Sequence, residues 1–283
     1  MTRLRNSDIC NISSQLEIYN RELLAKTQQS LLGIACHAYG KDEIQVKRQI
    51  KSFCIHVVPV TAGHGIITDF CKTVAAILQF LGFNTLVSDL PDASGVALAF
   101  ENRANAVMMA DDHRFVGLNL NNRCVADNSK ATGQVFASAL DLMAKGIKDC
   151  KVLVLGCGPV GEAAARTLLS LGAQVILCDI HLPAALSLKE RLCLYPGANN
   201  IVIEEDVSMA LSKYGYVLEA TPSVDTIPDK LICNHMFVAA PGVPLGISEN
   251  GCKIMKDRLI HDKLELGVAA MAVSLVSNQN KGD

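Results

Sequence analysis

Apolar positions in the first half of the chain alternate between short continuous runs and longer stretches at helical spacing. The runs at residues 54–61, 85–88 and 106–110 predict strands, and the stretches at 66–81 and after Pro91 predict the helices between them. Such alternation is typical of a parallel sheet with right-handed crossovers. Residues 1–130 are therefore expected to form a small α/β domain.

The same alternation resumes beyond residue 130. A long helix is predicted at 132–145 and another at 183–192, and apolar runs predict strands at 152–155, 174–178, near 201, and at 217–220, 236–239 and 259–260. We therefore expect a second domain with a parallel sheet at 131–263. The segment 264–276 is apolar at helical spacing, so residues 264–283 are expected to form a C-terminal helix that packs back on the first domain.

Helices are also predicted ahead of the first strand. One runs from Ser7 or Asp8 to about Ala25, and a second runs at 28–39 until Gly40 ends it. The charged segment 41–51 is expected to be a helix or loop that faces solvent.

A glycine-rich turn follows the apolar run at 152–155. Gly156, Gly158 and Gly161 have the G-x-G-x-x-G spacing, and a helix that begins near Pro159 and Val160 follows them. The first glycine permits a tight turn, the second lets backbone approach a pyrophosphate, and the third lets the helix pack closely on the strand. Phosphates would then bind at the helix N-terminus. This pattern predicts a dinucleotide pocket in a Rossmann-type domain.

Asp179 ends the next predicted strand, where an acid accepts hydrogen bonds from the adenosine ribose. A carboxylate there repels a 2′-phosphate, and no arginine occurs at 180–182. The sequence therefore favours NAD over NADP, unless an arginine arrives from another segment.

Composition narrows the class of protein further. The net charge of −2 and the pI near 6.4 give no electrostatic footprint for nucleic acid or anionic lipid. The chain has no predicted signal peptide and no apolar stretch of membrane-spanning length, so a cytoplasmic enzyme is expected. The eleven cysteines are scattered without a CxxC pair. They are interpreted as reduced thiols, Cys157 as a small filler, and no metal site is predicted.

Polar turns follow three strands of the first domain, at residues 59–65, 89–95 and 110–113. Because these turns follow strands of one sheet, they should converge. The paired acids Asp111 and Asp112 can act as a general base or anchor a substrate ammonium group, and each can instead cap a turn. His64 and His113 are candidate proton carriers. The predicted fold class is thus α/β and two-lobed, with an N-terminal α/β catalytic lobe plus a C-terminal Rossmann-type parallel sheet.

Loops of the second domain and the junction between the domains hold further candidates. Small residues that follow strands border the nicotinamide ring in two-lobed dehydrogenases, although the same residues also form plain turns. The candidates for this contact are Ala220, Thr221, Pro222, Pro241 and Gly242, with Asn128 and Thr132 at the junction. A substrate is expected in a cleft between the two lobes.

Five segments match one known family in order. They are VVPVTAGHGII at 57–67, SDLPDASG at 88–95, MMADDHRF at 108–115, LEATPSVDTIP at 218–228 and PGVPLGIS at 241–248. Together they resemble the pyrrolysine synthases, which complete pyrrolysine biosynthesis. The resemblance runs from about residue 57 to residue 271, and it is far more specific than the glycine turn alone.

The resemblance implies an NAD-dependent enzyme that oxidises the terminal amine of L-lysine-Nε-3-methyl-D-ornithine, an ornithyl-lysine dipeptide. Loss of ammonia and ring closure then give L-pyrrolysine. Asp111 is implied as the catalytic residue that acts on the substrate amine. The implied substrate-binding residues are Leu4, Arg5, Thr61, Ala62, His64, Asp112 and Asp262.

One departure from the family affects these assignments. Where the family turn is expected to read Thr-Ser-Gly, this chain has Thr61, Ala62 and Gly63, so Thr61 or His64 must replace the missing hydroxyl contact.

Two other functions fit the residues. One is an NAD-dependent dehydrogenase of an ordinary amino or hydroxy acid, and the other is an NAD-sensing protein without catalysis. A symmetric homodimer is expected, as two-lobed dehydrogenases commonly form one.

Overall fold

The computed structural model describes residues 4–277, which divide by their contacts into two compact units. Unit 1 comprises Met1–Glu22, Ser30–Ala131 and Leu264–Asp283, and unit 2 comprises Leu23–Gln29 and Thr132–Lys263. Parts of two predicted segments, residues 1–3 and 278–283, lie outside the described residues. Residues 23–29 group with unit 2, although the sequence pattern places them in the first domain.

Unit 1 contains a mixed five-stranded sheet. Its strands are β1 (Cys54–Val58), β2 (Asn84–Val87), β3 (Ala106–Ala110), β4 (Phe115–Asn119) and β5 (Val125–Asp127), in the order β2-β1-β3-β4-β5. The first three strands are parallel, whereas β3, β4 and β5 pair antiparallel, with Met108 opposite Gly117. The three predicted strands are therefore parallel as expected, and the antiparallel strands β4 and β5 lie in a segment, residues 115–127, for which the sequence analysis predicted no strand. Buried Asn119 interrupts the apolar pattern there, and its side chain accepts from the amides of Asn121 and Asn122.

The helices that accompany this sheet begin or end differently from the prediction at several places. They are α1 (Asn6–Ile9), α2 (Ile12–Thr27), α3 (Leu31–Ala38), α4 (Glu43–Ile50), α5 (Phe70–Phe80), α6 (Asp92–Glu101) and α12 (Glu265–Ser277). The predicted first helix is two helices, and Asp8 bonds the amide of Arg5 at the start of α1. The charged segment forms α4, which buries Val46 and Ile50. Because α5 begins at Phe70, residues 59–69 are left as a loop.

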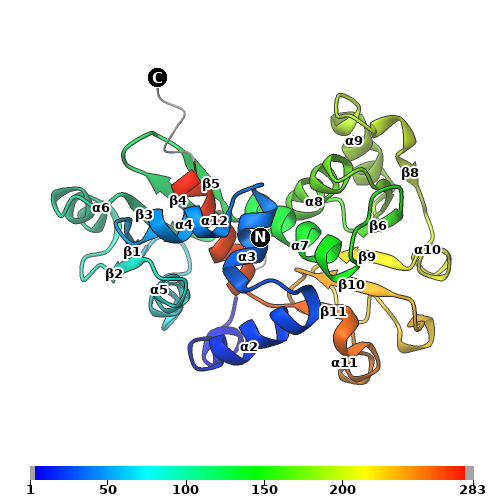
Figure 1. Cartoon of the computed structure of the whole chain (residues 1–283), viewed down its shortest axis with the longest axis horizontal. Helices are drawn as coiled ribbons and strands as arrows, with labels where there is room; N and C mark the ends of the chain where they lie inside the picture. Colours follow the sequence, from blue (N-terminus) through cyan, green and yellow to red (C-terminus); the bar gives the residue numbers. More distant parts are fainter. Residues whose placement is uncertain (1–3, 278–283) are drawn as a thin grey trace. The chain divides into compact units, whose positions relative to one another are not determined.

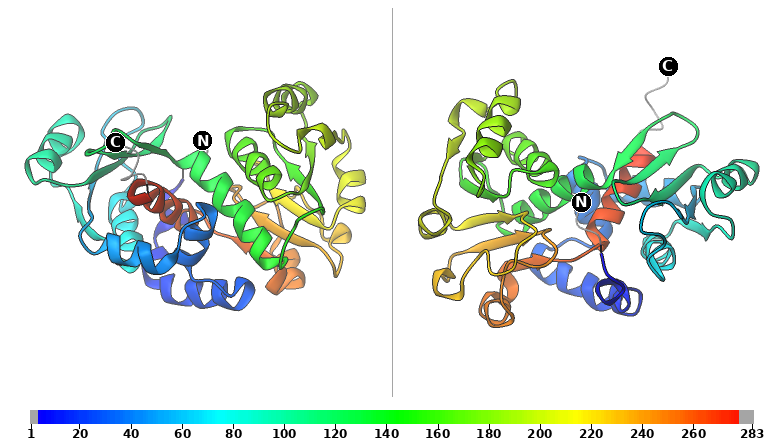
Figure 2. Two further views of the ribbon diagram at one scale, coloured as in Figure 1. Left: turned by 45° about the horizontal axis from the view of Figure 1, so that its top comes forward. Right: turned by 180° about the vertical axis from the view of Figure 1, so that it is seen from behind.

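The last helix, α12, belongs to unit 1. It contacts α3, α5, β4 and β5, and the red helix lies beside the blue N-terminal helices in Figures 1 and 2. Every apolar side chain from Leu266 to Val276 is fully buried. The Asn119 side-chain amide donates to the carbonyl of Leu275. Thus α12 completes the core of unit 1.

Unit 2 contains a parallel six-stranded sheet. Its strands are β6 (Lys151–Leu155), β7 (Gln174–Cys178), β8 (Val202–Ile203), β9 (Tyr216–Glu219), β10 (Phe237–Ala240) and β11 (Leu259–His261). Their order is β11-β10-β9-β6-β7-β8, and each neighbouring pair is parallel. The chain winds outward from β6 in one direction and from β9 in the other, which is the doubly wound Rossmann order. The point where the winding reverses lies between β6 and β9.

Helices cover both faces of this sheet. They are α8 (Pro159–Ser170), α9 (Leu182–Leu192), α10 (Val207–Lys213) and α11 (Glu249–Met255), and most of α7 (Asn128–Met143) also belongs to unit 2. Leu153 and Leu155 belong to the core that includes residues of α10 and α11, whereas Val154 faces the start of α8 at Gly161. Figure 2 shows α8, in green, across the sheet from α10 and α11, in yellow and orange. Among the described residues, no helix has both the length and the apolar character needed to cross a membrane.

Candidate functional site

The glycine turn lies at the carboxyl end of β6, beside the end of β9. Gly156 has a φ of 91°, and a Cβ there would lie 2.8 Å from the carbonyl oxygen of Ala220. A Cβ at Gly161 would lie 1.9 Å from the carbonyl oxygen of Gly156, so α8 packs on the turn at a distance that only glycine permits. A Cβ at Gly158 would meet nothing within 4 Å. No side chain caps α8, and its first N–H groups are suited to bind phosphate.

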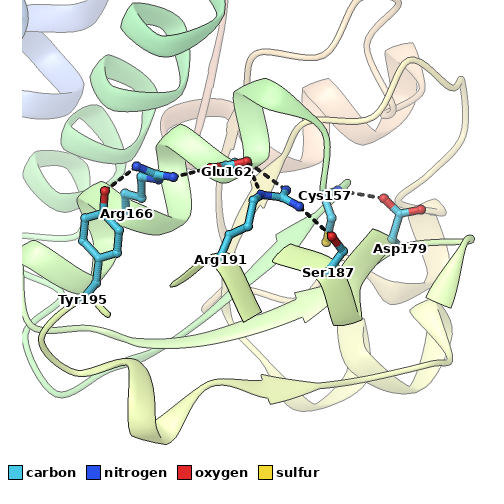
Figure 3. Close-up of polar contacts among 7 residues, drawn as sticks. All are labelled: Cys157, Glu162, Arg166, Asp179, Ser187, Arg191 and Tyr195. Carbon is cyan, nitrogen blue, oxygen red and sulfur yellow. Dashed lines mark hydrogen bonds and ion pairs between the residues drawn. The ribbon is translucent and has the colours of Figure 1, made fainter. Parts of the chain in front are cut away.

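Asp179 follows β7 and bonds to the glycine turn. Its Oδ2 accepts from the backbone N–H of Cys157 at 2.7 Å (Figure 3). Its Oδ1 accepts from the N–H of His181 at 2.8 Å. Each carboxylate oxygen has a second lone pair that a ribose hydroxyl can use. Burial raises the pKa of the Cys157 thiol to about 12, so this thiol stays neutral.

An arginine from α9 approaches the turn, but other side chains hold it. Arg191 binds Glu162 of α8 through Nε at 3.0 Å and Nη2 at 2.8 Å, and its Nη1 donates to Ser187 at 2.7 Å. Arg166 also bonds Glu162, and it donates to the Tyr195 hydroxyl. Partial burial opposes the ionisation of Glu162, but hydrogen bonds from both arginines lower its pKa. Figure 3 shows the two guanidinium groups directed to this carboxylate.

Glu219, at the end of β9, is an acid that the sequence analysis included in a predicted strand without giving it a role. Its side chain is 0 % exposed, and its Oε1 accepts from the Thr221 amide at 2.8 Å and from the Thr221 hydroxyl at 2.5 Å. Burial raises its pKa, and the hydrogen bonds from Thr221 and the backbone of Gly246 oppose that rise. The sequence signal that could have singled out Glu219 is an acidic residue at the end of an otherwise apolar strand.

Two of the candidates for the nicotinamide contact, Thr221 and Gly242, lie beside this acid. The amide of Gly242 donates to the Glu219 carbonyl at 3.3 Å, which fixes the turn that begins at Pro241. Pro222 follows Thr221 in an exposed turn. On α7, a Cβ at Gly133 would lie 2.2 Å from the carbonyl oxygen of Val160, so the residue after Thr132 packs against the start of α8. Asn128 is the first residue of α7 and is partly exposed.

In unit 1 the polar turns after β1, β2 and β3 meet, as their positions on one sheet predicted. Thr61 donates to Asp92 through its amide at 2.9 Å and its hydroxyl at 2.5 Å. His64 contacts Oδ2 of Asp112 through both its amide and its Nδ1, each at 2.7 Å. Between them, a Cβ at Gly63 would lie 2.0 Å from the same oxygen. Ala62 belongs to the same exposed turn and brings no hydroxyl.

Asp111 has a different environment from its neighbour Asp112. Its Oδ1 accepts from the amides of His113 and Arg114, each at 2.7 Å, and these bonds hold the pKa of Asp111 below its usual range. Asp111 therefore caps its turn, and its carboxylate is ionised at neutral pH. Such a group is a weak base and a good anchor for a cation.

The remaining candidates lie at chain segments near the ends of elements. Leu4 and Arg5 precede α1, and Asp262 follows β11 with 7 % exposure. Next to it, Nδ1 of His261 bonds the carbonyl of Ala240 at 2.8 Å. All eleven cysteines are free thiols. No group of side chains suited to a metal ion occurs in the described part of the chain.

Comparisons with known proteins agree with this geometry. The family described as alanine dehydrogenase/PNT, C-terminal domain, matches residues 124–210. In fold, the chain is similar to quinate dehydrogenase from Corynebacterium glutamicum in complex with NAD, with 14% identity and a TM-score of 0.56 over 80% of this chain and 94% of that chain. It is also similar to shikimate 5-dehydrogenase from Thermus thermophilus in complex with NADP(H) and shikimate, with 17% identity and a TM-score of 0.53 over 80% and 93%. Fold and glycine turn together define the class of this chain as Rossmann-type, the fold that these dehydrogenases share.

Similarity in sequence identifies the family. The family described as pyrrolysine biosynthesis protein PylD, N-terminal domain, matches residues 8–126. Pyrrolysine synthase from Methanosarcina barkeri is 32% identical over 98% of both chains, and that from Methanosarcina acetivorans is 31% identical over 98% of this chain and all of the relative. The chain belongs to the pyrrolysine synthase family, which confirms the resemblance seen in its motifs.

Proposed function

We propose that this protein is an NAD-dependent amine dehydrogenase that converts L-lysine-Nε-3-methyl-D-ornithine into L-pyrrolysine. The observation that carries the proposal is the glycine turn at the reversal point of a Rossmann sheet, joined to Asp179, in a chain of this family. The glycine turn and Asp179 would hold the cofactor, and an oxidised nicotinamide, when bound, would supply the acceptor for hydride from the terminal amine carbon of the substrate. Water hydrolyses the resulting imine to an aldehyde and releases ammonia, and the ornithyl α-amine then condenses with this aldehyde, with loss of one water, to close the five-membered ring.

The residues of unit 2 fit this cofactor. The uncapped start of α8 and the open face of Gly158 suit the pyrophosphate, and Asp179 suits the ribose. The arginine near the turn, Arg191, is bound by Glu162 and Ser187, so it is not placed to neutralise a 2′-phosphate. These features favour NAD over NADP. On the nicotinamide side, the contacts that we assign within unit 2 are Ala220, Thr221, Pro222, Pro241, Gly242 and Thr132.

Asp111 and Asp112 have different roles toward the substrate amine. Asp111, ionised and fixed by two backbone amides, anchors the substrate ammonium group. The amine must lose a proton before its carbon can give up hydride, and Asp111 is too weak a base to take it. His64, oriented by Asp112 through Nδ1, accepts this proton, since an imidazole that a carboxylate holds in place can act as a general base through its other ring nitrogen.

The test measures turnover by the purified protein in three assays. The first contains the dipeptide and NAD, the second contains the dipeptide and NADP, and the third contains simple amino acids and NAD. Reduction of NAD with the dipeptide supports the proposal. Reduction only with simple amino acids supports the ordinary dehydrogenase, and NAD binding without any turnover supports the sensor. We also propose a cytoplasmic homodimer, which sedimentation of the purified protein and localisation in cells would check.

A further inference from the structure

Glu219 is a fully buried acid that the reaction above leaves without a task. It ends β9, next to the point where the winding of the sheet reverses. An acid at 0 % exposure is unfavourable unless hydrogen bonds compensate for its lost hydration. The contacts of this side chain therefore indicate what it does.

One side of the carboxyl group fixes the loop after β9. Oε1 accepts two hydrogen bonds from Thr221, one from its amide and one from its hydroxyl. The same hydroxyl lies 2.9 Å from the hydroxyl of Thr226. Glu219 thus holds the start of the loop at 220–226 directly, through Thr221. It holds the end of the loop indirectly, because Thr221 contacts Thr226.

The other side of the carboxyl group packs against the turn after β10. A Cβ at Gly242 would lie 2.7 Å from Oε2, and a Cβ at Gly246 would lie 3.0 Å from Cδ. Within the described residues, Oε2 has no hydrogen bond of ordinary geometry, although the backbone of Gly246 lies near enough to help lower the pKa of the acid. The contact with these glycines is therefore mainly one of shape, and the turn at 241–247 rests directly on the carboxyl group.

We propose that Glu219 is a positioning residue that holds the loops at 220–226 and 241–247 in the shape that receives the nicotinamide end of the cofactor. This inference rests on the proposed function, because those loops carry the residues assigned to that contact. The carboxyl group acts as a hydrogen-bond acceptor of fixed size, and its charge is not required. A side chain of the same shape with a neutral acceptor should replace it.

The experiment is calorimetric titration of NAD into the full-length protein and four variants. Glu219→Ala removes the acceptor and the volume, Glu219→Met keeps most of the volume without an acceptor, and Glu219→Gln keeps both. Glu204→Gln is the matched control, since Glu204 also follows a strand of unit 2 but binds Lys213 and Tyr214. Thermal melting of each variant confirms that it is folded.

We expect Glu219→Ala and Glu219→Met to raise the Kd for NAD about tenfold, because both variants release the loop that the two hydrogen bonds from Thr221 hold in place. Glu219→Gln and Glu204→Gln should remain within about twofold of the wild type. If the alanine variant does not fold, the methionine variant decides. Wild-type affinity in the folded variants without an acceptor, or an equal loss in Glu219→Gln, would overturn the inference. Absence of NAD binding by the wild type would overturn the proposed function as well.

Discussion

Gly158 separates the cofactor role of the glycine turn from its structural role. Its φ of −74° and ψ of −173° are open to any residue, and a Cβ there would meet nothing within 4 Å. Gly158→Ala should therefore leave the free energy of unfolding unchanged or raise it by about 0.4–1 kcal/mol, because alanine has less freedom in the unfolded chain. The new methyl group would, however, stand where backbone must approach the pyrophosphate.

Displacing a phosphate from the N–H groups at the start of α8 forfeits a charge-assisted hydrogen bond of about 1.5–3 kcal/mol, so the Kd for NAD should rise by about 10- to 100-fold. Gly161→Ala is the matched contrast, since its Cβ would lie 1.9 Å from a backbone oxygen, against 3.4–4 Å for an ordinary contact. It should destabilise the fold by about 3 kcal/mol. Urea unfolding and NAD calorimetry measure both quantities. A stable Gly158→Ala protein with wild-type NAD affinity would refute the assignment of the turn.

Further predictions concern single side chains of both units. Asp111→Asn keeps the acceptor for the two turn amides, so it should fold and bind NAD but lose turnover by at least about 100-fold; steady-state kinetics measure this. His64→Gln should lower kcat, because it removes the proton acceptor, while His113→Gln, at an exposed position of the turn after β3, should leave kcat unchanged; steady-state kinetics measure both. Asp179→Asn should weaken NAD binding about tenfold and narrow the preference over NADP, as titration with both cofactors would reveal. Burial lowers the pKa of His56, whose ring nitrogens have no partner among the described residues. Below about pH 6.5, His56 therefore binds a proton more readily in the unfolded chain than in the folded chain, so the free energy of unfolding should decrease as the pH drops below that value. His56→Leu should make this decrease smaller, as urea unfolding at a series of pH values would measure.

The parts of the fold with a regular period could be predicted from the sequence. Strands β6 and β7 and the glycine turn appear where the apolar runs and glycine spacing placed them. The antiparallel strands β4 and β5 could not be predicted in this way. Their pattern mixes Gly117 and Asn119 into buried positions, and Asn119 is satisfied by a distant carbonyl of α12. Such compensation comes from tertiary contacts, which no local pattern contains.

For the candidate site, the sequence predicted that the polar turns of unit 1 converge, but it did not predict the contacts of each side chain. The three turns of unit 1 meet because they follow strands of one sheet, which the sequence makes visible. Which acid caps the turn and which binds His64 depends on side-chain directions within two adjacent residues, Asp111 and Asp112. The task of Glu219 was also hidden, since its partners Gly242 and Gly246 are brought to it by the pairing of β9 with β10.

The most direct test of the account is the absorbance of NADH after mixing the purified protein, NAD and the ornithyl-lysine dipeptide, with mass spectrometry of the product. We predict a rise in NADH accompanied by a product with the mass of pyrrolysine. A flat trace from protein whose NAD binding is confirmed by calorimetry would contradict the proposed substrate and reaction, while leaving the dinucleotide site in place.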